Sequence, residues 1–204
     1  MMNEEEFATL LARGYETRGV EFKGPRSRSE KAAFAPVARA MLGMANHQDG
    51  GLVVIGVDEN NHILRPTGLS ETDLGTWVYD DVAAAVNEYA SPSVVFDLEI
   101  VTHNGVRFVV LRVHEFEDIP VLCSRDYQSI LRRGACYVRS RHKPETSEIP
   151  SEEEMRALLS AAVQKGLDQW VKQALTAGLI RPVGLATTVE PSAESRFDTQ
   201  RGGF

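Results

Sequence analysis

Cysteine is scarce in this sequence: only Cys123 and Cys136 occur among its 204 residues. Two cysteines cannot build the disulfide framework of a small secreted domain, and their spacing differs from the close pairs of a zinc knuckle. His114 and His142 complete no recognised ligand pattern with them, so these four residues do not predict a zinc site. We interpret both cysteines as ordinary strand residues.

Long hydrophobic runs are also missing. The longest apolar stretches, residues 52–55 and 108–111, have the length of a strand and fall far short of the roughly 20 residues that cross a bilayer. The N-terminus reads Met-Met-Asn-Glu-Glu-Glu and is acidic where a secretory or transit peptide would be basic and apolar. The sequence therefore predicts a cytoplasmic protein without a membrane segment.

Overall positive charge is lacking too, since the net charge is −7. An acidic balance argues against a nucleic-acid partner, because phosphate binding depends on lysine and arginine. Residues 125–143 reverse that balance, however, with Asp126 as their one acid. The basic residues of this strip are Arg125, Arg132, Arg133, Arg139, Arg141 and Lys143. A basic surface can therefore exist on an acidic protein.

The remaining composition is that of an ordinary folded domain, with 43% hydrophobic and 25% charged residues. Apolar periodicity predicts helices over residues 4–13, 29–46 and 70–89, and strands over 19–23 and 52–57. Pro36 predicts either a kink in the second helix or a start nearer Ala35. After residue 92 the pattern becomes β-rich, and Asn104-Gly105 predicts a hairpin between residues 94–101 and 106–113. Short strands follow at 121–124 and 135–140. This order indicates a mixed α/β, or α+β, fold.

The C-terminal part reads differently from the body of the chain. A helix begins near Pro150, a second covers residues 167–177, and residues 181–204 lack apolar periodicity, which predicts a disordered tail. We therefore divide the chain into a domain at 1–150, a helical extension at 151–180 and a tail at 181–204. The helices carry apolar side chains beyond the needs of one small domain: Leu158, Leu159, Ala162, Val163, Trp170, Val171, Ala174 and Leu175. They predict a homodimer, unless they cover the monomer's own sheet.

Two segments carry candidate chemistry. On a strand, Glu21 and Lys23 share one face while Val20 and Phe22 anchor the other, and Glu16 can join them only through a bend near Gly19. A salt-bridged surface strand would have the same residues. The second segment places Gly50-Gly51 before a buried strand that ends at Asp58. Asp58 is then either a site carboxylate at a strand end or a turn residue.

Together these elements resemble the Schlafen/AlbA-like domain family over residues 14–150. The ordered matches are Glu16, Glu21-Phe22-Lys23, Ala45-Asn46, Gly50-Gly51, Ile55-Gly56-Val57-Asp58, Pro120 and Tyr137-Val138-Arg139. One departure is His47-Gln48-Asp49, three residues where the family usually has two before the glycines. It leaves open whether Asp58 or Glu59 is the third carboxylate.

The resemblance implies a single domain with a mixed sheet and flanking helices, and a metal-dependent endoribonuclease that cuts RNA, tRNA in particular. Glu16, Glu21 and Asp58 would bind Mg²⁺ or Mn²⁺, cations that prefer oxygen ligands, and Lys23 would stabilise charge on the phosphate. A further set of basic residues would hold the RNA backbone: Arg132, Arg133, Arg139, Arg141 and Lys143. These basic residues could equally form a solvated face.

Two other functions stay open beside the nuclease. Many family members are described as nucleic-acid-binding regulatory modules that need no metal. An ATP-binding role ranks last, because Gly50-Gly51 is not part of a G-x-x-x-x-G-K-[ST] loop. For a bacterial member the resemblance also implies a place in phage defence or as a toxin, with a defence-system protein as partner.

Overall fold

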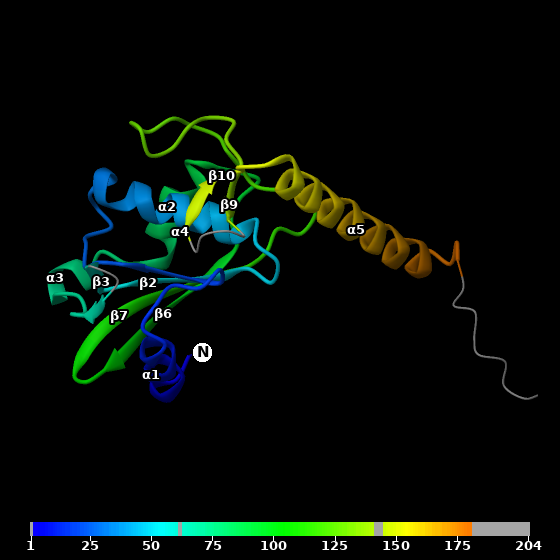
Figure 1. Ribbon diagram of the computed structural model, residues 1–204. Helices are drawn as coiled ribbons and strands as arrows, with labels where there is room; N and C mark the ends of the chain where they lie inside the picture. Colours follow the sequence, from blue (N-terminus) through cyan, green and yellow to red (C-terminus); the bar gives the residue numbers. More distant parts are fainter. Residues whose placement is uncertain (1, 61–62, 141–144, 181–204) are drawn as a thin grey trace, which may run out of the picture. The chain divides into compact units, whose positions relative to one another are not determined.

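A four-stranded mixed sheet lies at the centre of the structure, a computed structural model that describes residues 2–60, 63–140 and 145–180 (Figure 1). The strands in spatial order are β1 (Val20–Lys23), β2 (Gly51–Ile55), β7 (Val106–Val113) and β6 (Phe96–His103). β1 pairs with β2 in parallel, and the other two pairings are antiparallel. This mixed sheet with flanking helices confirms the predicted α+β fold.

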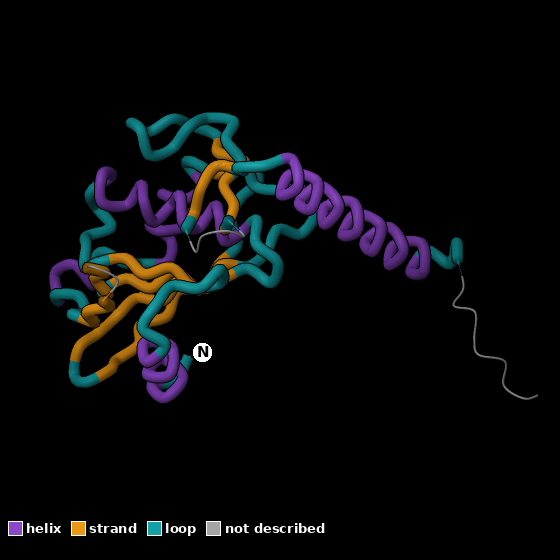
Figure 2. The backbone as a smooth tube through the Cα atoms, viewed as in Figure 1, coloured by secondary structure: helices purple, strands orange, loops and turns teal. Residues whose placement is uncertain are grey.

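Helices cover both faces of this sheet (Figures 1 and 2). α2 (Lys31–Ala45) packs on one face with α4 (Tyr79–Asn87) against it, and α1 (Glu4–Ala12) packs on the other face. Side chains of a strand alternate between the faces, so Val53 joins the α2 core while Val54 joins the α1 core. Burial on both faces explains why β2 is apolar throughout.

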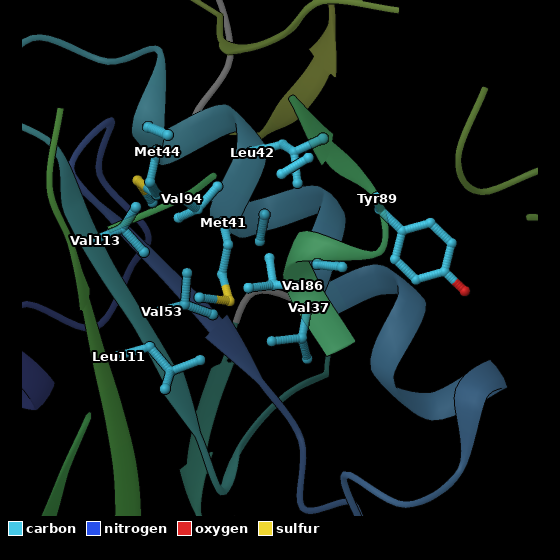
Figure 3. Close-up of a cluster of buried hydrophobic side chains, with 14 of the residues drawn as sticks. Val37, Met41, Leu42, Met44, Val53, Val86, Tyr89, Val94, Leu111 and Val113 are labelled. Carbon is cyan, nitrogen blue, oxygen red and sulfur yellow. The ribbon is translucent and has the colours of Figure 1, made fainter. Parts of the chain in front are cut away.

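The larger core forms where α2 meets the sheet (Figure 3). Val37 and Met41 of α2 are fully buried, as are Val53 and Leu111 of the sheet. In the turn between α2 and β2, Gly50 has a φ of +71°, and a Cβ atom there would overlap the carbonyl oxygen of Val113. The predicted close backbone approach at the paired glycines is thus present.

Smaller elements complete the fold. The hairpin between β6 and β7 turns at Asn104 and Gly105, both with positive φ, as predicted. The two-stranded pairs and the short helix are β3 (Val57–Asn60) with β4 (Ile63–Pro66), β5 (Ala90–Ser91) with β8 (Leu122–Cys123), β9 (Tyr137–Arg139) with β10 (Thr146–Glu148), and α3 (Glu71–Leu74). Three of these strands, β4, β5 and β10, were absent from the sequence-based prediction.

The predicted helix over residues 70–89 is in fact two helices, α3 and α4. Between them, Trp77 is buried and its indole Nε1 donates a hydrogen bond to the carbonyl oxygen of Arg26 at 3.0 Å. Thr76 Oγ1 accepts a hydrogen bond from the backbone N–H of Arg28 at 2.9 Å. These tertiary contacts fix a non-helical linker that the apolar periodicity does not reveal.

The predicted strand over residues 52–57 is also divided. β2 ends at Ile55, and Gly56, with a φ of +107°, redirects the chain into β3. Only glycine adopts this conformation readily, so the change of direction depends on Gly56. Asp58 consequently lies within a separate hairpin, opposite Arg65, and not in the turn that the sequence suggested.

One continuous helix, α5 (Glu152–Thr176), replaces the two C-terminal helices predicted from sequence. Gly166 lies inside it, and a single interior glycine costs a helix only about 1 kcal/mol. The chain divides into two compact units, Met1–Lys165 and Gly166–Phe204. The predicted tail, residues 181–204, lies outside the described residues.

The residues predicted to form a dimer surface differ in exposure along α5. Leu159, Val163 and Trp170 are 52%, 64% and 58% exposed, whereas Leu158 is buried in the core. The homodimer stays a prediction. Among the described residues, no helix has the length and apolar character needed to cross a membrane.

Candidate functional site

The period-2 alternation of β1 positions Glu21 and Lys23 as the sequence predicted. Val20 and Phe22 are buried in the core beneath α1, so Glu21 and Lys23 point to the opposite face, where α2 lies. β1 is an edge strand of the sheet. Its polar side chains are therefore open to residues that approach from elsewhere in the chain.

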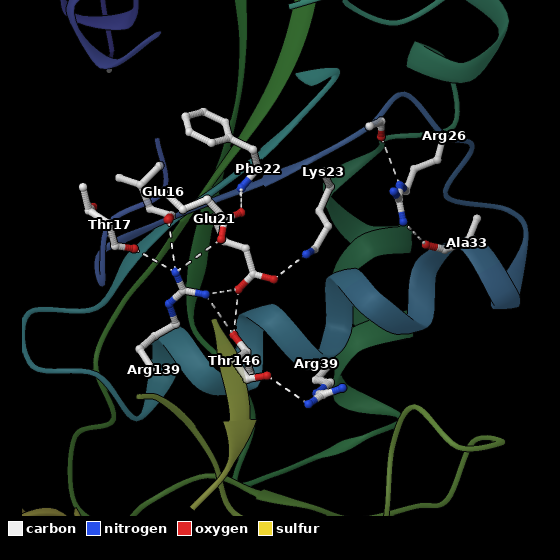
Figure 4. A network of polar contacts seen from close by, with 12 residues as sticks. Glu16, Thr17, Glu21, Phe22, Lys23, Arg26, Ala33, Arg39, Arg139 and Thr146 are labelled. Carbon is white, nitrogen blue, oxygen red and sulfur yellow. Dashed lines mark hydrogen bonds and ion pairs between the residues drawn. The ribbon is translucent and has the colours of Figure 1, made fainter. Parts of the chain in front are cut away.

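Arg139 is the residue that approaches (Figure 4). It comes from β9, its side chain has no exposed surface, and its Nη1 atom contacts Glu21 Oε2. The same guanidinium donates hydrogen bonds to three carbonyl oxygens near the sheet edge: those of Thr17 at 2.8 Å, Arg18 at 3.0 Å and Val20 at 3.2 Å. Arg139 thus ties the β9–β10 hairpin to β1.

Both carboxylate oxygens of Glu21 are engaged (Figure 4). Oε2 also accepts a hydrogen bond from Thr146 Oγ1 at 2.7 Å, and Oε1 contacts the ammonium of Lys23. The Glu21 side chain is only 7% exposed. Two cations and a hydroxyl group therefore satisfy a carboxylate whose burial would otherwise be unfavourable.

Glu16 joins the same group through the bend that the sequence required. Its Oε1 atom accepts a hydrogen bond from the backbone N–H of Phe22 at 2.8 Å, and its Oε2 atom lies 4.0 Å from Arg139 Nη2. Burial raises the pKa of Glu16 above its usual value; the hydrogen bond from Phe22 opposes this shift, and the charge of Glu21 adds to it.

Asp58 lies elsewhere. It is exposed on β3, and its carboxylate lies so close to Gly24 that a Cβ atom at Gly24 would overlap it. The charge of Asp58 acts on Arg26, a half-buried residue whose pKa is lowered by burial. Glu59 projects to the opposite side of the strand, so Asp58 is the carboxylate on the side of β1.

The three carboxylates do not meet as predicted. The structure brings Glu16 and Glu21 together around Arg139, but within the described part of the chain no three His, Cys, Asp or Glu side chains are grouped to hold a metal. Mg²⁺ and Mn²⁺ need several free oxygen ligands, and the oxygens of Glu21 already contact cations. As arranged, these residues do not fit a divalent cation.

The predicted RNA-binding strip is also divided. Arg132 is exposed and pairs with Glu148 at 2.6 Å, an interaction that lowers the pKa of Glu148. The backbone N–H of Arg133 donates to Asp126 at 2.9 Å. Arg139 was predicted to lie on an exposed strip, but its side chain is buried. The reason is its ion pair with the buried carboxylate of Glu21. Arg141 and Lys143 lie outside the described residues.

Sequence reasoning missed Arg18 and Arg39 as members of the site. The guanidinium of Arg18 donates to the carbonyl oxygen of Arg139 at 3.4 Å, and that of Arg39 donates to the carbonyl oxygen of Thr146 at 2.9 Å. We call the connected side chains the Glu21 network. Its charged members are Glu16, Arg18, Glu21, Lys23, Arg39 and Arg139. The one sequence signal that could have identified Arg39 is its helical position, because it interrupts the apolar face of α2.

The residues tested for zinc lie apart from this network. Cys123 and Cys136 are buried, and burial raises the pKa of both thiols, that of Cys136 to about 11. His114 lies on the surface beside Asp97, with 2.9 Å between Nε2 and the carboxylate. His142 lies outside the described residues. The two thiols are therefore protonated near neutral pH.

The fold and the Glu21 network thus define a mixed α+β domain whose edge strand carries a glutamate and a lysine on one face, with an arginine from a late hairpin bound to the glutamate. The model of the family described as Schlafen, AlbA_2 matches residues 16–147, more than half of the chain. The chain therefore belongs to the Schlafen, AlbA_2 family. A comparison with curated proteins finds no match.

Similar solved structures include two bacterial proteins. The DIP2311 protein from Corynebacterium diphtheriae is 14% identical with a TM-score of 0.47, and the match covers 69% of this chain and 23% of that one. The N-terminal domain of a RecG-related protein from Nitrosomonas europaea is 22% identical with a TM-score of 0.48, covering 65% of this chain and 89% of that one. The match thus spans less than a quarter of the DIP2311 protein.

Proposed function

We propose that this domain binds RNA on the face formed by β1, α2 and the β9–β10 hairpin. The charge of the Glu21 network is the observation that supports this. Its four cationic and two acidic side chains leave a net charge of +2 before the nearby acid Glu145 is counted, on a protein whose overall charge is −7. A local positive charge on an acidic protein attracts phosphate to that one place.

Three of the cations are accessible to a phosphate. Arg18 is exposed, Lys23 is 21% exposed and Arg39 is partly exposed. Neither Arg18 nor Arg39 forms an ion pair among the described residues. Such cations can contact a phosphate without first breaking a protein salt bridge. The choice of RNA over DNA follows the resemblance to nucleases of this family.

Binding is tested by fluorescence anisotropy of labelled tRNA at several salt concentrations. Lys23→Gln is expected to weaken binding several-fold and to lower the salt slope by roughly 0.7–0.9, the value for one lost phosphate contact. Lys172→Gln is the control, because Lys172 is exposed on α5, which is not part of the network or of the proposed RNA-binding face. Equal effects of the two variants, or tighter binding of DNA than of tRNA, would contradict the proposal.

Cleavage of the bound RNA is a second candidate, with Glu16, Glu21 and Asp58 as catalytic carboxylates and Mg²⁺ or Mn²⁺ as cofactor. Two carboxylates that share one guanidinium, one of them with a raised pKa, favour this candidate, because perturbed acids are common in active sites. The present separation of Asp58 argues against it.

A denaturing gel decides between binding and cleavage. Purified protein is incubated with total tRNA and Mn²⁺, Mg²⁺ or EDTA, alongside the Glu16→Gln, Glu21→Gln and Asp58→Asn variants. Metal-dependent fragments that each variant abolishes would establish cleavage, and single variants would then be about as inactive as combined ones. Intact tRNA in every lane, together with specific binding, would leave the domain as an RNA-binding module.

A further inference from the structure

A cavity of about 360 Å³ lies beside the Glu21 network, between residues 46–49 and the first turns of α5. Its wall is partly apolar, with Phe116, Leu158 and Ala161. The polar side chains that line it include Arg18, His47, Gln48, Asp49, Glu115 and Arg139. The turn that departs from the family pattern, His47-Gln48-Asp49, therefore forms one side of this cavity.

Arg18 gives the cavity an available positive charge. Its side chain is exposed and donates one hydrogen bond, at 3.4 Å, to the backbone carbonyl oxygen of Arg139, which leaves most of its five N–H donors open. Among the described residues it forms no ion pair. Arg139 adds a second positive charge from the interior, and this charge lies close enough to His47 to lower its pKa.

His47 is held in a defined orientation. Its Nδ1 atom lies 2.8 Å from the carbonyl oxygen of Gly50, which can only accept, so Nδ1 carries a proton and Nε2 is the titrating atom. Burial lowers the pKa of His47, and the charges of Arg18 and Arg139 lower it further. His47 is therefore neutral near pH 7 while the cavity holds no anion.

The acids of the cavity do not cancel Arg18. Glu115 pairs with Lys165 at 3.1 Å and accepts a hydrogen bond from the backbone N–H of Asp49 at 3.2 Å. Asp49 is exposed, so water screens its charge. Glu154 is buried in the cavity wall and is itself engaged in an interaction within the protein. Arg18 and His47 thus remain the groups able to take up an anion.

The geometry points to a phosphodiester subsite in this cavity, in which Arg18 binds one phosphate of the RNA backbone and protonated His47 donates a second hydrogen bond from Nε2. This inference rests on the proposed RNA binding. In the empty cavity the charges of Arg18 and Arg139 repel a protonated His47, whereas a bound phosphate would attract it. Phosphate binding and the protonation of His47 therefore favour each other. RNA affinity is therefore expected to rise as the pH falls through the His47 titration.

The test measures binding of a 12-nucleotide oligouridylate by anisotropy between pH 5 and pH 8. His47→Asn keeps an N–H donor for the carbonyl of Gly50 but has no titrating Nε2, so its affinity is expected to lose the pH dependence of the wild type. Arg18→Gln is expected to weaken binding about tenfold, within the range of a charged hydrogen bond. Arg13→Gln is the matched control, because Arg13 is also exposed and lies outside the cavity.

NMR titration of the His47 ring gives an independent measurement. Addition of oligouridylate is expected to raise the pKa of His47 in the wild type. In the Arg18→Gln variant the same addition is expected to leave the pKa of His47 unchanged. Unchanged pH dependence in His47→Asn, or equal effects of Arg18→Gln and Arg13→Gln, would overturn the subsite while RNA binding stands. Failure of the wild type to bind tRNA or oligouridylate at any pH would overturn the subsite and the proposed function together.

Discussion

Replacement of Arg139 by methionine removes the cation that holds Glu21 inside the protein. The variant loses the guanidinium at Glu21 Oε2 and the donors for the carbonyl oxygens of Thr17, Arg18 and Val20. Breaking a buried ion pair by removing one partner costs about 3–5 kcal/mol. Lys23 still contacts Glu21 Oε1, so we expect a loss of about 3 kcal/mol in the free energy of unfolding.

A double variant separates the buried charge from the lost packing. Glu21→Gln combined with Arg139→Met leaves no buried carboxylate at residue 21, so it is expected to be more stable than Arg139→Met alone by about 1–2 kcal/mol. Arg133→Met serves as the control, because the contact at Arg133 is made by its backbone N–H, and its effect is expected within about 0.5 kcal/mol.

Urea unfolding at pH 7, followed by circular dichroism, measures all three variants. The midpoint and the slope together give the free energy of unfolding. A loss below about 1 kcal/mol in Arg139→Met, or a double variant no more stable than the single one, would refute the role assigned to this ion pair.

Three further predictions concern other parts of the molecule. Because burial raises the pKa of Glu16, its charged form opposes folding above that pKa; Glu16→Gln should therefore be more stable than the wild type at pH 7, with the difference vanishing in thermal unfolding below about pH 4. Asn46→Ala removes buried hydrogen bonds to the backbone of Val121 and Tyr137 and should cost about 2–4 kcal/mol by urea unfolding. Light scattering of the wild type should give twice its 22.5 kDa, and Trp170→Glu should be monomeric; a monomeric wild type would contradict the dimer.

Local patterns in the sequence predicted much of the fold. Alternation along β1 placed Glu21 and Lys23 together, and Asn104-Gly105 predicted the hairpin between the two long strands. The helix at residues 4–13 is present as α1, with Asn3 and Glu6 forming its capping box. Each of these features depends on residues a few positions apart, which a sequence displays directly.

Features that depend on distant partners were not visible in the sequence. Arg139 lies 118 residues from Glu21, and within a basic run it resembles an exposed residue. The position of Asp58 depends on the positive φ of Gly56, which turns the chain out of the sheet. Neither event leaves a periodic pattern, so the carboxylates could be named from the sequence but their convergence could not.

The hydrogen bonds from Arg139 to β1 also affect how the protein behaves in concentrated solution. An edge strand exposes backbone groups to which a strand of another molecule can add, and this is a common route to aggregation. Here the carbonyl oxygens of Thr17 and Val20 are already occupied by a side chain that solvent cannot reach. Loss of Arg139 would therefore leave these backbone acceptors free to pair with a strand of another molecule, and would also leave the charge of Glu21 without its arginine partner. The solubility of this domain thus depends on the same residue as its stability.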